Sequence, residues 1–163
     1  MKTQQGTDQL TNVKVDYKSL ALIATDLLFI FDQNPKLACD QLMQILVAAT
    51  DSEEISSWSM IERAEATDAC RQIINLIHAV VPLTQEKYIL SQEEKNTLDG
   101  AINEIIDVYD NTGTTINLLL KLLGAAMSGE TSDIWERNDR SNVTHLCRYV
   151  VNMLLSVKVG SQT

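Results

Sequence analysis

Apolar residues recur every three or four positions along most of this chain, which is the spacing of one face of an α-helix. Over residues 17–32 a single stripe is formed by Leu20, Ala24, Leu27 and Phe31. Asp16 stands just before this segment as an N-cap, and Asn34-Pro35 marks the start of the next one. Similar stripes predict further helices over residues 35–49, 58–81 and 141–158.

The most regular pattern runs from about residue 92 to residue 128. Ser91 followed by Glu94 forms a capping box that opens it. Its apolar positions then alternate in steps of four and three, as a heptad seam of Leu98, Ile102, Ile105, Tyr109, Thr112, Ile116, Leu119, Leu123 and Ala126. Residues 111–115 are poor helix formers, but the seam keeps its phase across them. We therefore expect one long helix with a bend at that point.

These segments predict an all-α fold, a single-domain bundle of five or six mostly antiparallel helices. The chain has 163 residues, which is the size of one domain. It has only six glycines and two prolines, too few for the turns that many short strands would need. We expect a flexible N-terminal arm over residues 1–15, the helical domain over residues 16–158 and a C-terminal tail over residues 159–163.

The charge balance excludes two classes of partner. Thirteen Lys and Arg face 22 Asp and Glu, for a formal charge of −9, and no window clusters the cations that nucleic acid requires. An anionic membrane surface repels such a chain, and no apolar run approaches the roughly 18 residues of a membrane span. Cys39, Cys70 and Cys147 include no CxxC pair. We interpret them as small buried hydrophobes in a reducing compartment, the cytoplasm.

Two pairs of carboxylates are the strongest candidates for chemistry. Glu62 and Glu65 are three residues apart in one predicted helix, as are Glu104 and Asp107 in another, so each pair shares a helix face. Together they offer the oxygen ligands that Mg²⁺ prefers. This pattern resembles the ExxE and ExxD pairs of all-helical nucleotide pyrophosphohydrolases, and the resemblance implies a Mg²⁺-dependent hydrolase. At about 100° per residue, however, Glu104 and Asp107 point away from the apolar seam, which favours a solvated acidic face.

The two histidines indicate no active site. His78 lies at the edge of an apolar face, where we expect a partly buried packing residue, and His145 lies on an outer face. Neither has a cysteine or carboxylate at metal-ligand spacing, and the chain contains no nucleophile motif or phosphate-binding glycine loop. We therefore predict no cofactor and no catalytic residue.

Apolar residues outside the core stripes are more informative. Leu22 and Phe29 project about half a turn away from the stripe of the first helix, and Leu118 and Leu122 lie outside the heptad seam. A helix that is apolar on two sides is either central in the fold or covered by a partner. The sequence leaves both explanations open.

The prediction for function is a non-enzymatic protein-binding module, cytoplasmic and homodimeric, that uses an apolar helix face formed by Leu22, Phe29, Leu118 and Leu122. Its acidic surface would select a basic protein and speed association. Small regulators, inhibitors, immunity proteins and adaptors of bacteria or their phages have this character. The alternatives are the Mg²⁺-dependent hydrolase and a small-molecule sensor with a pocket between helices.

Overall fold

The computed structural model describes residues 13–85, 89–109, 112–128 and 137–159, and this part of the chain is all-α. Its six helices are α1 (Tyr17–Ile30), α2 (Pro35–Thr50), α3 (Met60–Val80), α4 (Gln92–Tyr109), α5 (Thr112–Ser128) and α6 (Arg137–Leu155). Two 3₁₀ turns, η1 (Glu54–Ser57) and η2 (Val81–Thr84), lie on either side of α3. The predicted all-α bundle is confirmed, and the helices predicted over residues 17–32, 35–49, 58–81 and 141–158 agree to within a few residues with α1, α2, α3 and α6.

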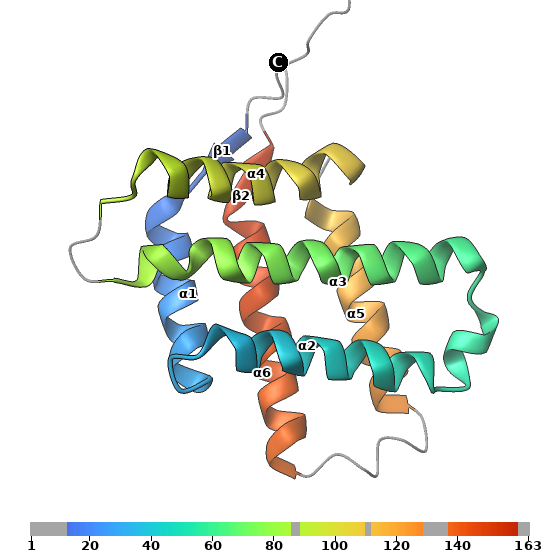
Figure 1. Cartoon of the computed structure of the whole chain (residues 1–163). Helices are drawn as coiled ribbons and strands as arrows, with labels where there is room; N and C mark the ends of the chain where they lie inside the picture. The colour runs from blue at the N-terminus through green and yellow to red at the C-terminus, as the bar shows by residue number, and fades with distance from the viewer. Residues whose placement is uncertain (1–12, 86–88, 110–111, 129–136, 160–163) are drawn as a thin grey trace, which may run out of the picture.

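The helices form two crossed layers. In Figure 1, α2, α3 and α4 run side by side as a first layer, and α1, α6 and α5 form a second layer that crosses behind it. The core fills the space between the layers, where the largest buried side chains include Leu20, Leu27, Leu42, Ile73, Leu76 and Leu119. No helix in the described ranges has both the length and the apolar character needed to cross a bilayer.

Local sequence signals place most helix starts. Asp16 accepts hydrogen bonds from the backbone N–H and the hydroxyl of Ser19 and thereby caps α1. Asn34 caps α2, with proline at the first helical position. The capping box of Ser91 and Glu94 is present. Helix α3 begins with a second capping box, formed by Ser59 and Glu62, that the sequence analysis overlooked.

The expected long helix over residues 92–128 is wrong. The chain instead forms two helices, with α4 in the first layer and α5 in the second (Figure 1). Leu98, Ile102 and Ile105 are buried in α4 as the seam predicted, but the buried face of α5 consists of Thr115, Leu118, Leu119, Leu122, Ala125 and Ala126. Residues 112–115, although poor helix formers, begin α5, and the buried stripe of α5 shares only Leu119 and Ala126 with the predicted seam.

A small antiparallel ribbon closes one end of the bundle. Strand β1 (Val13–Val15) pairs with β2 (Val157–Val159), with Val13 opposite Val159. Residues 13–15 therefore do not belong to a free arm, and the last helix ends at Leu155 rather than at residue 158. Alternating β-branched valines favour extended backbone on both segments. Residues 1–12 and 160–163 lie outside the described part of the chain.

Candidate protein-binding surface

The four carboxylates of the hydrolase hypothesis are engaged in separate structural contacts. Glu62 accepts a hydrogen bond from the backbone N–H of Ser59 at 2.8 Å, and its Oε1 lies 3.4 Å from Nζ of Lys121. The Ser59 hydrogen bonds, reinforced by Lys121, lower the pKa of Glu62. This carboxylate is therefore held as an anion by the N-terminus of its own helix and by a lysine of α5.

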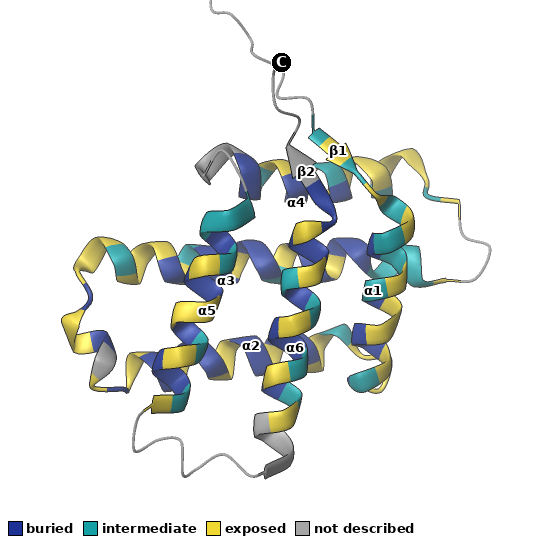
Figure 2. Cartoon of the chain, turned by 180° about the vertical axis from the view of Figure 1, so that it is seen from behind, coloured by how far each residue is buried: buried dark blue, intermediate teal, exposed yellow. Residues whose placement is uncertain are grey.

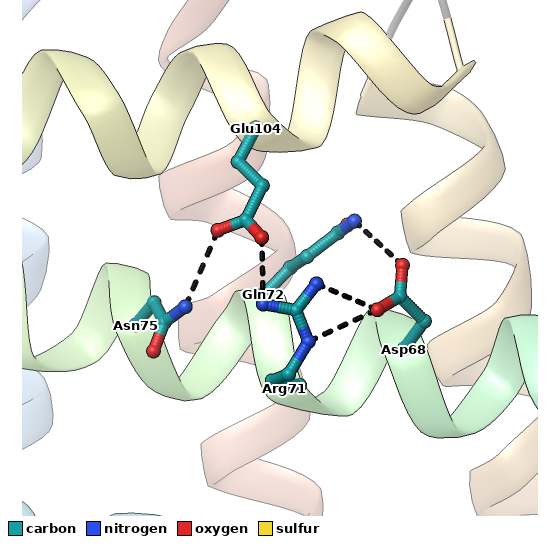
Figure 3. Close-up of polar contacts among 5 residues, drawn as sticks. All are labelled: Asp68, Arg71, Gln72, Asn75 and Glu104. Carbon is teal, nitrogen blue, oxygen red and sulfur yellow. Dashed lines mark hydrogen bonds and ion pairs between the residues drawn. The ribbon is translucent and has the colours of Figure 1, made fainter.

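Glu104 belongs to a polar network between α3 and α4 (Figure 3). Arg71 donates to Glu104 at 2.6 Å and to Asp68 at 2.6 Å, and Asn75 donates to the other Glu104 oxygen at 3.3 Å. These hydrogen bonds, with Asp68 the larger contribution, raise the pKa of Arg71. Gln72 also donates to Asp68, at 2.9 Å. The network joins the two neighbouring helices of the first layer.

The expected solvated position of Glu104 is therefore only partly correct. Its side chain is about one third exposed and faces α3, because α4 lies beside α3 in the same layer as well as over the core. Glu65 is an exposed residue of α3, and the side chain of Asp107 lies outside the described residues. In the described ranges, no three His, Cys, Asp or Glu side chains gather as metal ligands.

This arrangement predicts the response to magnesium. We expect millimolar MgCl₂ to leave the melting temperature unchanged. Glu62 and Glu104 already have cationic partners, and each belongs to a separate salt bridge. Differential scanning fluorimetry with MgCl₂, and with NaCl at matched ionic strength as the control, measures this. A saturable rise in melting temperature that Glu65→Gln abolishes would restore the four-carboxylate site.

A cysteine and a histidine meet between α2 and α3. Sγ of Cys39 lies 3.6 Å from Nε2 of His78. His78 was predicted to be partly buried, but it is exposed. Burial, followed by the charge of Asp40, raises the pKa of the Cys39 thiol to about 11. A catalytic cysteine requires a lowered pKa, so this pair is a packing contact rather than a nucleophile and its base. All three cysteines are free and buried, as predicted.

The four predicted partner-binding residues separate into two groups. Leu22 and Phe29 are 62% and 76% exposed, on the side of α1 opposite its buried stripe. Leu118 and Leu122 are buried inside this chain, which corrects the expectation that they form an exposed face. Helix α5 packs against α2, α3, α4 and α6, so both side chains are covered within the bundle. Of these four residues, Leu22 and Phe29 alone present apolar surface to a partner.

Leu22 and Phe29 lie on a continuous exposed strip, which we call the α1 face. In chain order it consists of Lys18, Leu22, Thr25, Asp26 and Phe29, and Asp32 is exposed two residues beyond the end of the helix. Figure 2 turns the second layer toward the viewer, with α1 at its edge. Sequence analysis identified the two apolar members, but it missed Lys18 and Asp26 because single surface charges carry no local signal.

An open groove adjoins the α1 face near the β-ribbon. Its volume is about 680 Å³, and it is lined by Lys14, Val15, Asp16, Ser19, Ile23, Asn152, Leu155 and Ser156. Leu155 is more than half exposed there. The groove could not be predicted from local patterns, because it brings together residues 14–23 and 152–156, which are far apart in the sequence. It widens the apolar surface beside α1 and is open to solvent, unlike the enclosed pocket of a small-molecule sensor.

Charge is distributed unevenly between the layers. Helices α2, α3 and α4 together carry four basic and nine acidic residues, whereas α1 carries only Lys18 and Asp26. The acidic surface that was expected to accompany the apolar one therefore lies mainly in the other layer. The α1 face itself is close to neutral, so the net charge of −9 is not concentrated where an apolar contact would form.

Comparison with known proteins assigns this chain to no family. No family model matches it, and neither a curated protein nor a solved structure is significantly similar to it. The case for a function therefore depends on the geometry and chemistry of the α1 face.

Proposed function

We propose that this protein is a non-enzymatic protein-binding module that engages its partner through the α1 face, in the manner of a small regulator, inhibitor, immunity protein or adaptor. One observation carries the proposal: Leu22 and Phe29 are 62% and 76% exposed on a helix whose opposite side is fully buried. Large apolar side chains held on a rigid helix, next to an open groove, are typical of interaction sites.

The spacing of the two side chains suits a helical or flat protein surface. Seven residues correspond to two helical turns, so Leu22 and Phe29 stand about 10 Å apart along α1. Burial of apolar area contributes roughly 25 cal/mol per Å², and aromatic anchors near the centre of an interface commonly dominate binding energy. Phe29 is the expected principal anchor.

The surroundings of the carboxylates support binding over hydrolysis. The salt bridges of Glu62 and Glu104 occupy two of the oxygen donors that a Mg²⁺ site would need. Free, buried thiols at all three cysteines suit a reducing compartment, and we propose the cytoplasm as the location. The first partner proposed is a second copy of this chain, as a homodimer.

The test is a pair of double variants with matched chemistry. Leu22→Glu with Phe29→Glu is expected to abolish self-association and the capture of any partner from the native host, with the melting temperature nearly unchanged because both positions are exposed. Sedimentation velocity and affinity capture with mass spectrometry measure the two effects.

The control places the same charges on exposed apolar positions of α2. Met43 and Val47 are 43% and 55% exposed, outside the α1 face. The Met43→Glu and Val47→Glu double variant is expected to retain the binding that the α1 variant loses. If both double variants bind as well as the wild type, the α1 face is not the binding surface.

A further inference from the structure

Two side chains that can bind metal ions meet between α2 and α3, in the first layer. Cys39 of α2 and His78 of α3 are 39 positions apart in the sequence, and their Sγ and Nε2 atoms lie 3.6 Å apart. We propose that this pair binds a Zn²⁺ ion. The site lies outside the α1 face and the groove, so it stands apart from the proposed function.

The separation of the two atoms is that of two ligands on a tetrahedral ion. Zinc binds a cysteine sulfur at about 2.3 Å and a histidine nitrogen at about 2.0–2.1 Å, so at a tetrahedral angle these atoms stand roughly 3.6 Å apart. Sγ of Cys39 and Nε2 of His78 already have this spacing. When the ion binds, the thiol proton of Cys39 passes to solvent and the thiolate and the neutral imidazole become ligands.

The chemistry of the donors selects the ion. A thiolate with an imidazole suits Zn²⁺ or Cu⁺ rather than Mg²⁺ or Ca²⁺, and the tetrahedral spacing favours Zn²⁺. His78 is exposed and Cys39 is 7% exposed, so water reaches the site and can supply the other two ligands. A zinc ion with two protein ligands is held more weakly than one in a four-residue structural site, and we expect a dissociation constant on the order of 10 μM.

Both ligands stand on rigid elements that lie side by side. Cys39 is in the second turn of α2, and His78 is in the last turn of α3. The two helices are neighbours in the first layer (Figure 1). The backbone N–H of Val81 donates to the carbonyl of His78 and closes α3 at this point. Ligands on packed helices hold their geometry without the ion, so binding costs little ordering of the chain.

Electrostatics at this place favour a cation. His78 lies near the C-terminus of α3, where the helix dipole places partial negative charge. Asp40 follows Cys39 in α2, and its charge acts on the sulfur. Lys36, one turn before Cys39, is the nearest cation along α2. The three helices of this layer carry four basic and nine acidic residues, so the layer as a whole attracts cations.

Titration of the full, reduced chain with two metals tests the site. Isothermal titration calorimetry with ZnCl₂ measures affinity, and CoCl₂ reports the ligand type, because a thiolate bound to Co²⁺ gives strong near-ultraviolet charge-transfer absorption. The wild type is expected to bind one Zn²⁺ per chain and to develop this absorption with Co²⁺. His78→Gln is expected to weaken zinc binding about tenfold or more, and Cys39→Ala to abolish the absorption.

Matched variants remove the other candidate ligands. Cys70→Ala takes away a buried thiol from the same helix as His78, and His145→Gln takes away the second histidine; both are expected to keep the zinc affinity and the cobalt absorption. Circular dichroism checks folding, and His78→Gln, at an exposed position, decides the test if Cys39→Ala does not fold. Absorption that persists in Cys39→Ala, zinc affinity unchanged in His78→Gln, or a wild type that binds no zinc at millimolar concentration overturns the site. None of these results bears on the α1 face.

Discussion

Replacement of Leu122 by alanine is expected to lower the free energy of unfolding by about 2–5 kcal/mol, whereas Leu22→Ala should change it by less than about 0.5 kcal/mol. The two leucines have the same chemistry and both lie in helices. Leu122 is completely buried and Leu22 is 62% exposed. Truncation at position 122 removes apolar contacts and leaves a cavity in a packed core, while truncation at position 22 opens no cavity. Urea unfolding followed by circular dichroism measures both values.

Protein concentration is the important control for this comparison. The measurement belongs below the dissociation constant of the dimer, because loss of a subunit contact at Leu22 would otherwise add to its effect. Leu118→Ala serves as a second buried position on the same helix face, at 7% exposure. Comparable losses for Leu22→Ala and Leu122→Ala in the monomer would contradict the orientation of α1 described above.

The second large effect concerns alkaline pH. Burial raises the pKa of the thiols of Cys70 and Cys147 from 9.0 to about 12, and for Cys147 the nearby Cys70 adds to this effect. Unfolding releases both thiols to ionise near their ordinary pKa, so the neutral folded form is most favoured below pH 9. Between pH 8 and pH 10 each thiol is expected to cost the folded state about 1.4 kcal/mol, roughly 3 kcal/mol together, and the loss continues toward pH 12.

Urea unfolding at intervals of half a pH unit, from pH 7.5 to pH 10, checks this expectation. The Cys70→Ala and Cys147→Ala double variant starts from a lower stability, because alanine is smaller than cysteine in a packed core. The thiol of Cys39, whose pKa is also raised, remains in this variant, so its free energy of unfolding is expected to fall over this range by about one third of the wild-type change. A slope equal to that of the wild type would show that these thiols do not cause the pH dependence.

The sequence by itself determined the features that depend on neighbours a few residues apart. The all-α class and most helix positions follow from apolar periodicity, since a helix buries residues three and four apart. The helix starts at Asp16, Asn34 and Ser91 follow from local hydrogen bonds to the first backbone N–H groups. The two-sided apolar character of α1 was also visible, because Leu22 and Phe29 project opposite its buried stripe.

Only the tertiary structure decided which of these surfaces stay exposed. The second apolar side of α5 is buried within the bundle, whereas that of α1 faces outward at the edge of its layer. Likewise, Glu104 pairs with Arg71 of α3 while about one third of its side chain stays exposed, because α4 has a neighbour at its side as well as beneath it. Periodicity shows how many faces of a helix are apolar. Which face another helix covers depends on chain turns such as the one between α4 and α5, and on contacts between residues far apart in the sequence.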